Sequence, residues 1–145
     1  MGRVRELGSL DDVIEICHRL KPLSTDAATL NPDDWVRPVL DFAHLHAVTG
    51  GGFRDAPAFE RALAAADAVM APEIPFHIHF SDVSFANRNE LVHLPYGEGT
   101  LHAEPLAEAV AQFDRQATVI GESPDESSNQ VIRTLLLGRP LEGRR

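Results

Sequence analysis

The chain has 145 residues, of which 43% are hydrophobic and 24% are charged, so its length and composition are those of one globular domain. Its net charge of −9 argues against a free-standing nucleic-acid binder, unless a metal cluster supplies local positive charge that this count omits. The sequence shows neither an apolar signal core nor a run of apolar residues long enough to span a bilayer, which predicts a cytoplasmic protein without membrane contact.

The first predicted element is a helix over Ser9–Leu20. Ser9 is a suitable N-cap, and the two aspartates that follow Leu10 favour the positive end of the helix dipole. Apolar residues recur along one side of this helix, and Cys17 is among them. Because Cys17 is the only cysteine, an internal disulfide is excluded, and a buried, unreactive thiol is predicted.

Strands and helices alternate along the rest of the chain. A polar connector through Asn31–Asp34 leads to a predicted strand over Val36–Leu40, and Pro38 suits the start of that strand or a sheet edge. A loop with three glycines is predicted after Asp41. The remaining predicted elements are a helix over Ala56–Met70, a strand over Ile74–Phe80, a long irregular loop from Ser81 to about His102, a helix over Glu104–Phe113, a strand over Thr118–Gly121 and a helix over Asp125–Leu137.

This alternation of about three strands with about four helices predicts an α/β fold with parallel strand pairing. The carboxyl ends of parallel strands meet at one edge of a sheet, where the sites of such folds form. The sequence contains no glycine-rich nucleotide-binding motif and no serine-hydrolase motif, so those activities have no support.

Metal-ligating side chains stand at the ends of the three predicted strands. Asp41 ends the first, with His44 three residues later, and His79 and Glu122 end the second and third. His93 lies in the long loop. Imidazole and carboxylate groups are ligands that suit Zn²⁺, Mn²⁺ or Fe²⁺ rather than Ca²⁺. The sequence therefore predicts a metal site at this edge of the sheet.

The other histidines have a plainer interpretation. A single histidine is more often packed or on the surface than a ligand, and His18 and His102 are interpreted in that way. For His46 and His77 ligation is the less favoured alternative, and His77 could instead face a barrel interior. Asp82 is either a further ligand or the group that orients His79.

In chain order, four segments resemble the endonuclease IV family of apurinic/apyrimidinic endonucleases, above all its archaeal-type branch: Leu40–Ala47, His77–Ser81, His93–Pro95 and Gly121–Pro124. That family belongs to the xylose isomerase-like TIM barrels. The resemblance covers nearly the whole chain, since Met1–Leu10 is similar to the segment just after the fifth strand of the family. It implies that residues 1–145 form one partial domain, the C-terminal half of a (β/α)8 barrel, with strands six to eight preceded by helix five.

The resemblance also implies a chemistry. A cluster of up to three zinc ions, or Mn²⁺ in their place, would activate water for cleavage of the DNA backbone 5′ to an abasic site, in base excision repair. Matched one by one to the family, the implied metal ligands are Asp41 and His44 from the sixth strand, His79 from the seventh, His93 from the following loop and Glu122 from the eighth. Asp41 and Glu122 are also the implied catalytic residues. The number of ions and the choice of metal stay open.

Two departures from the family pattern matter. The family has an aspartate ligand two residues before the loop histidine, where this chain has Leu91, so either the neighbouring Glu90 replaces that ligand or the ligand is lost. The family's ligands from the first half of the barrel have no counterpart in this sequence. We therefore expect the chain to bind fewer metal ions than the family does, and to bind them more weakly. Three strands cannot close a barrel, so the resemblance implies a truncated reading frame, or completion by a separate N-terminal half-barrel or by a second copy.

Two further functions remain as alternatives. A sugar isomerase or epimerase of the same fold would use one divalent ion, and the acidic composition favours it, whereas the histidine-rich strand ends favour the endonuclease. The third alternative is a non-catalytic fragment or assembly subunit. Whether the chain is active alone stays open at this point.

Overall fold

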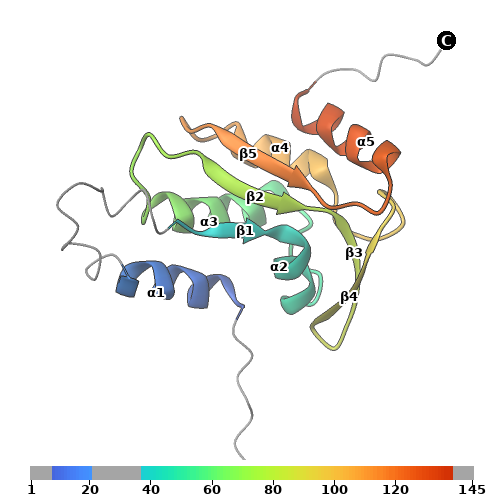
Figure 1. Ribbon diagram of the computed structural model, residues 1–145, viewed down its shortest axis with the longest axis horizontal. Helices are drawn as coiled ribbons and strands as arrows, with labels where there is room; N and C mark the ends of the chain where they lie inside the picture. The colour runs from blue at the N-terminus through green and yellow to red at the C-terminus, as the bar shows by residue number, and fades with distance from the viewer. Residues whose placement is uncertain (1–7, 21–36, 139–145) are drawn as a thin grey trace, which may run out of the picture.

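The computed structural model describes residues 8–20 and 37–138, and these residues form five helices and five strands (Figure 1). In chain order they are α1 (Leu10–Leu20), β1 (Val39–Asp41), α2 (Phe42–Val48), α3 (Ala56–Asp67), β2 (Phe76–Phe80), β3 (Asp82–Ala86), β4 (Asn89–Leu94), α4 (Ala103–Val110), β5 (Ala117–Gly121) and α5 (Glu126–Leu136). The predicted connector through Asn31–Asp34 and the first residue of the strand predicted over Val36–Leu40 lie outside the described residues.

The central sheet has three parallel strands in the order β1-β2-β5. Its register places Asp41 beside His79, and His79 beside Ile120. The α/β class and the parallel pairing predicted from the sequence are therefore confirmed. All three strands end at the same edge of the sheet, on the right of Figure 1.

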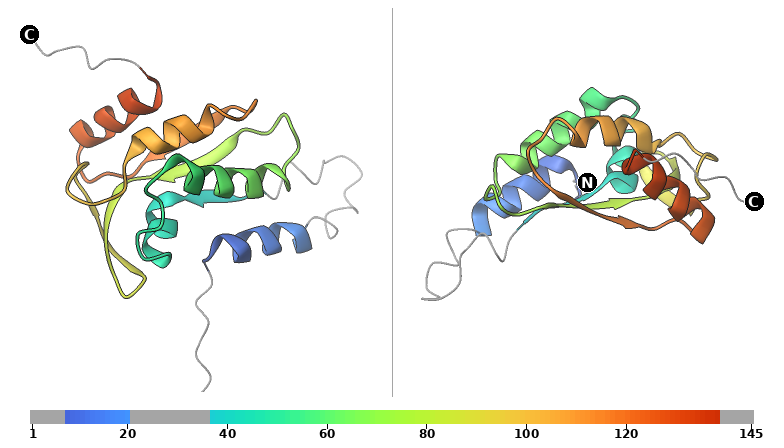
Figure 2. Two further views of the ribbon diagram at one scale, coloured as in Figure 1. Left: turned by 180° about the vertical axis from the view of Figure 1, so that it is seen from behind. Right: turned by 90° about the horizontal axis from the view of Figure 1, so that it is seen from above.

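The hydrophobic core lies between the sheet and the helices on one of its faces. Figure 2 shows α3 and α4 lying over this face. Phe76, Ile78 and Phe80 alternate along β2 toward the helices and are fully buried. Beside them, the rings of Phe42 and Phe59 pack with their centroids 4.8 Å apart. Cys17 of α1 is also buried, as predicted.

The opposite face of the sheet carries no helix among the described residues (Figure 2). Because successive side chains in a strand point to opposite faces, this open face is formed by the alternate set of residues. Two of its apolar members, Val39 and Ile120, are 43% and 42% exposed. The set comprises Val39, Asp41, His77, His79, Thr118 and Ile120. Both predicted ligands within the strands therefore lie on the open face.

Two predicted loops are regular structure instead. The residues after Asp41 form helix α2, because the carboxylate of Asp41 accepts a hydrogen bond from the backbone N–H of His44 and so caps the helix. The segment predicted as an irregular loop from Ser81 begins with the antiparallel hairpin β3–β4. Its turn residues Asn87 and Arg88 have φ angles of 52° and 64°, the left-handed geometry of a tight hairpin turn.

Arg115 joins the loop before β5 to the end of α3. Its side chain is 5% exposed and binds the carboxylate of Asp67 at 2.7 Å. The same guanidinium donates to the backbone carbonyls of Ala71 and Ile74 and lies over the ring of Phe76. The carbonyl of Ala71 also accepts from the N–H of Ile74, so Arg115 adds a second donor there and supplies the donor for the carbonyl of Ile74.

We expect Arg115→Ala to lower the free energy of unfolding by about 2–4 kcal/mol, because it removes buried packing and the contact with Asp67 and leaves the carbonyl of Ile74 without its donor. Arg115→Lys should recover only part of this loss, since lysine lacks the planar fork of donors. Urea unfolding followed by circular dichroism measures the effect, with Arg133→Ala, at an exposed position of α5, as the control. A change below about 0.5 kcal/mol for Arg115→Ala would contradict this role.

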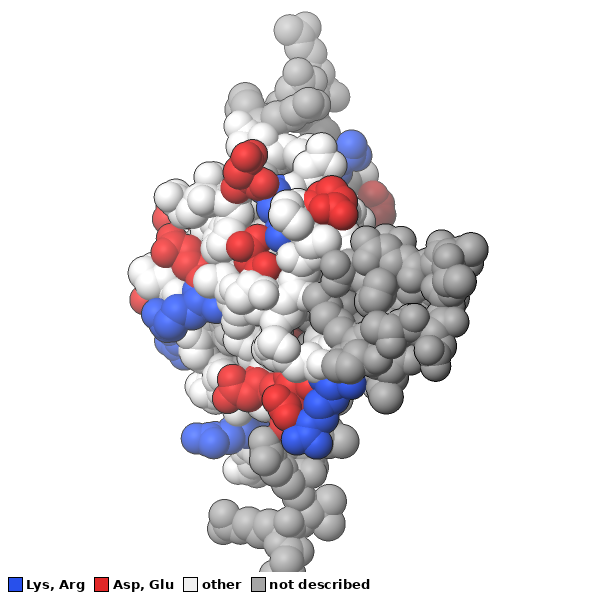
Figure 3. Space-filling model, turned by 90° about the vertical axis from the view of Figure 1, so that its left-hand side faces the viewer, with Lys and Arg blue, Asp and Glu red and all other residues white. Residues whose placement is uncertain are grey.

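Acidic and basic side chains are interspersed at the end of the molecule opposite the carboxyl edge of the sheet, and the visible basic residues form no continuous surface there (Figure 3). None of the helices in the described ranges is long and apolar enough to cross a membrane.

Candidate metal centre

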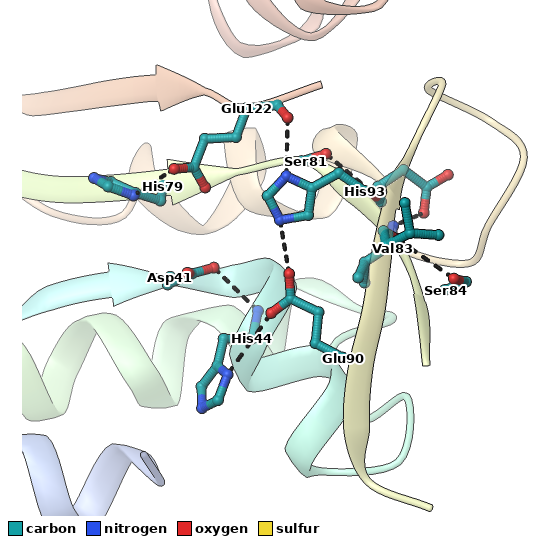
Figure 4. A network of polar contacts seen from close by, with 11 residues as sticks. Asp41, His44, His79, Ser81, Val83, Ser84, Glu90, His93 and Glu122 are labelled. Carbon is teal, nitrogen blue, oxygen red and sulfur yellow. Dashed lines mark hydrogen bonds and ion pairs between the residues drawn. The ribbon is translucent and has the colours of Figure 1, made fainter. Parts of the chain in front are cut away.

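Asp41, His79 and Glu122 converge at the carboxyl edge of the sheet (Figure 4). Each offers one ligand atom, and the three atoms lie within 4.8 Å of one another. The sheet itself brings them together: Asp41 pairs with His79 in register, and the N–H of Glu122 donates to the carbonyl of Phe80 at 3.1 Å. These three residues, which the sequence places at the ends of three strands, are thus close together in the structure.

Local contacts orient the three side chains. Oδ1 of Asp41 accepts the helix-capping hydrogen bond at 3.0 Å, and its other oxygen, Oδ2, makes no hydrogen bond to the described residues. Nδ1 of His79 lies 3.0 Å from Oε1 of Glu122, and both side chains are 29% exposed. Two carboxylates and one imidazole in partial burial form a negatively charged donor set that fits a divalent cation such as Zn²⁺ or Mn²⁺.

A second group of side chains adjoins the first. Glu90 lies between two imidazoles: Oε1 is 2.7 Å from Nε2 of His93, and Oε2 is 3.7 Å from Nδ1 of His44 (Figure 4). The five residues predicted as ligands are therefore divided, since His44 and His93 lie with Glu90 rather than with the triad. Glu90 was predicted only as one of two alternatives, and it is the residue that connects the two histidines.

The backbone of Glu122 connects the two groups. Its carbonyl oxygen lies 2.9 Å from Nδ1 of His93 and so favours a proton on that nitrogen, which turns Nε2 toward Glu90. Burial lowers the pKa of His93, but the carbonyl of Glu122 and the carboxylate of Glu90 outweigh it, so the net effect is a raised pKa. The carbonyl of Glu122 and the carboxylate of Glu90 thus favour the protonated form of the ring.

Asp82 has a structural role, and both predicted roles for it at the metal site are wrong. It is fully buried and accepts four backbone hydrogen bonds, at distances of 2.7 to 3.2 Å. The donors are Val83, Gly97, Gly99 and Leu101. Its carboxylate therefore fixes the segment that follows the hairpin and does not contact His79.

The remaining histidines agree with their plainer interpretation. His46 is buried, accepts a hydrogen bond from the N–H of Phe53 and pairs with the hydroxyl of Thr100. Burial, aided by the nearby charge of Arg54, lowers the pKa of His46. His18 and His102 are exposed. The ring of His77 lies on the open face, 5.4 Å from that of His79 between centroids, and belongs to neither ligand group.

The chain was also compared with known proteins. No family model matches it, and no solved structure matches it. Over 125 residues, or 85% of the chain, it is 28% identical to an uncharacterized protein of Methanocaldococcus jannaschii. The chain spans only 41% of the length of that relative. The likeness thus connects the chain with a longer archaeal protein and assigns no activity.

Proposed function

We propose that the chain supplies part of a metal-dependent phosphodiester hydrolase of the endonuclease IV type, which acts on abasic sites in DNA. The observation that carries this proposal is the convergence of Asp41, His79 and Glu122 at the ends of three neighbouring parallel strands. These are the residues to which the family resemblance assigns zinc. Zn²⁺ is the metal proposed, with Mn²⁺ as the alternative.

The chain's own residues have distinct parts in this chemistry. A divalent ion held here would lower the pKa of water and offset charge on phosphoryl oxygens. The capping bond to Oδ1 of Asp41 fixes that carboxylate beside the other two side chains of the cluster. The contact between Glu122 and His79 fixes a second carboxylate beside it. Because the ligands lie at the carboxyl edge of the sheet, a phosphodiester would approach them at that edge.

We further propose that the three-stranded sheet is one wall of a (β/α)8 barrel. Sequential order of parallel strands, helices on one face and ligands on the other all support this arrangement. The exposed Val39 and Ile120 would then face the barrel interior. An N-terminal half-barrel or a second copy of the chain would complete it, and the much greater length of the archaeal relative favours the first.

The proposal is tested on an abasic duplex oligonucleotide, with a panel of ketoses as competing substrates and Zn²⁺ or Mn²⁺ in the buffer. The protein is assayed alone and after co-expression with the sequence encoded upstream of Met1. We expect scission 5′ to the abasic site, lost in Glu122→Gln and kept in Glu98→Gln, which changes an exposed residue. Turnover of sugars alone would favour the isomerase. Inactivity on both substrates in every preparation would favour a non-catalytic assembly subunit.

A further inference from the structure

A cavity of about 590 Å³ lies between α1, α2, α3 and the turn of the hairpin. Its walls come from the start of α1, from α2 and the loop after it, from α3 and from the turn between β3 and β4. The apolar residues that line it are Leu10, Leu45, Val48, Phe53, Ala58 and Ala62. A cavity of this size with a mostly apolar wall is typical of a site for a small organic ligand.

The charges around this cavity differ from those of the whole chain. The chain has 22 acidic residues against 13 lysines and arginines. None of the described residues that line the cavity is acidic, and two of them, Arg61 and Arg88, are arginines. Both arginines are exposed, and neither forms an ion pair with another described residue. Their guanidinium groups are therefore accessible to an anion beside an apolar space.

Two other hollows of the described surface show that this charge distribution is particular to the cavity. The groove between β5 and α5 has a similar volume, about 640 Å³, but Glu126 lines it together with Arg133. The hollow at the loop before β5 has Glu73 and Asp114 beside Arg115. In both, acidic groups offset the arginine and oppose an anion, whereas the first cavity has no such opposition among its described residues.

The apolar wall of the cavity is fixed by the hydrophobic core. The ring of Phe53 packs edge-on against the rings of Phe42 and Phe59, with centroids 5.3 Å apart in each pair. Leu45 and Ala62, which also line the cavity, are buried. Because these side chains belong to the core, the cavity has its shape before a ligand binds, and a ligand loses little affinity to reorganisation.

We propose that this cavity binds a small organic phosphate monoester, whose apolar body fills the space between the helices and whose phosphate pairs with Arg61 and Arg88. A phosphate monoester carries a charge of about −1.5 to −2 at neutral pH, which two guanidinium groups match. Arginine also presents paired N–H donors that suit phosphate oxygens. This site lies beyond the proposed function, since it requires neither a metal ion nor DNA.

The test measures the affinity of octyl phosphate for the metal-free protein by isothermal titration calorimetry in EDTA, below the micelle concentration. We expect one molecule bound per chain. Octylammonium has the same apolar chain with the opposite charge, and inorganic phosphate has the anion without the chain. Each should bind at least about tenfold more weakly, because it lacks one of the two contacts.

The variants assign the binding to this cavity. Arg61→Gln combined with Arg88→Gln should weaken octyl phosphate at least about tenfold, and Ala62→Phe, which fills the space, should have an effect as large. Arg133→Gln, in the groove between β5 and α5, is the matched control and should stay within about twofold. Circular dichroism checks the fold of each variant, and if Ala62→Phe does not fold, the arginine variants decide.

Three results would overturn this inference. They are equal binding of octylammonium, unchanged affinity in the double arginine variant, and loss of binding after co-expression with the sequence encoded upstream of Met1. The last would mean that polypeptide fills the cavity. None of the three bears on the proposed function, which depends on zinc and on cleavage of abasic DNA. Conversely, a protein that binds no zinc but binds octyl phosphate would refute only the proposed function.

Discussion

Asp82→Ala should lower the free energy of unfolding by about 3–5 kcal/mol, the largest effect on stability that we expect of any single substitution here. Oδ1 of Asp82 accepts from the backbone of Val83 and Leu101, and Oδ2 accepts from Gly97 and Gly99. Alanine would remove the acceptor of all four N–H groups, and those of Val83 and Leu101 belong to buried residues. Urea unfolding, monitored by circular dichroism, gives the measurement.

Two further variants sharpen this prediction. Asp82→Asn keeps the size of the side chain but replaces one oxygen by an amide donor, so it should lose one pair of hydrogen bonds and cost about 2–4 kcal/mol. Asp114→Ala, at an exposed position, should change stability by less than about 0.5 kcal/mol. Zinc content should be unaffected by Asp82→Asn in the folded protein. Loss of zinc from that variant at full stability would contradict the purely structural role of Asp82.

His79→Ala should weaken the binding of zinc to the cluster of Asp41, His79 and Glu122 by about 100-fold or more. Groups that only orient a metal ligand typically contribute about 10–100-fold to metal affinity, and loss of a ligand itself should cost at least as much. His79 is the one nitrogen donor among the three converging side chains. Titration against a fluorescent zinc chelator measures the affinity, and cleavage of the abasic oligonucleotide should fall with it.

His77→Ala is the matched control for this variant. His77 lies on the same strand and the same open face, with its ring next to that of His79, but it is not one of the converging ligands. Its replacement should leave zinc affinity within about threefold of the unaltered protein, since it removes none of the three proposed ligands. Equal losses of zinc affinity in the two variants would mean that both imidazoles act only through the electrostatics of the open face. That result would contradict the assignment of His79 as a specific ligand in the proposed triad.

The sequence was most informative where one simple rule governs the structure. Parallel strands end at the same edge, so side chains at strand ends meet, and this predicts the convergence of Asp41, His79 and Glu122 before any coordinates are known. The alternation in Phe76–Phe80 likewise predicts which side chains are buried and which lie on the open face.

Other features depended on contacts that no local pattern reveals. The hairpin turn was missed because Arg88, rather than glycine, occupies a left-handed position. The glycines after residue 49 suggested a loop and obscured helix α2, which is stabilised by its N-cap and by the burial of Phe42. The role of Asp82 depends on backbone donors that are up to 19 residues away. A polar residue close to a histidine in sequence was therefore mistaken for a partner of that histidine.

The capping of α2 by Asp41 has a consequence for the precision of the site. Asp41 is followed directly by Phe42, whose ring is fully buried against Phe53 and Phe59. Phe42 thus anchors the helix in the core, and the residue before it both caps the helix and presents the proposed ligand oxygen. The proposed ligand is held in place by the same packing that folds the domain, so its position would not depend on a bound ion.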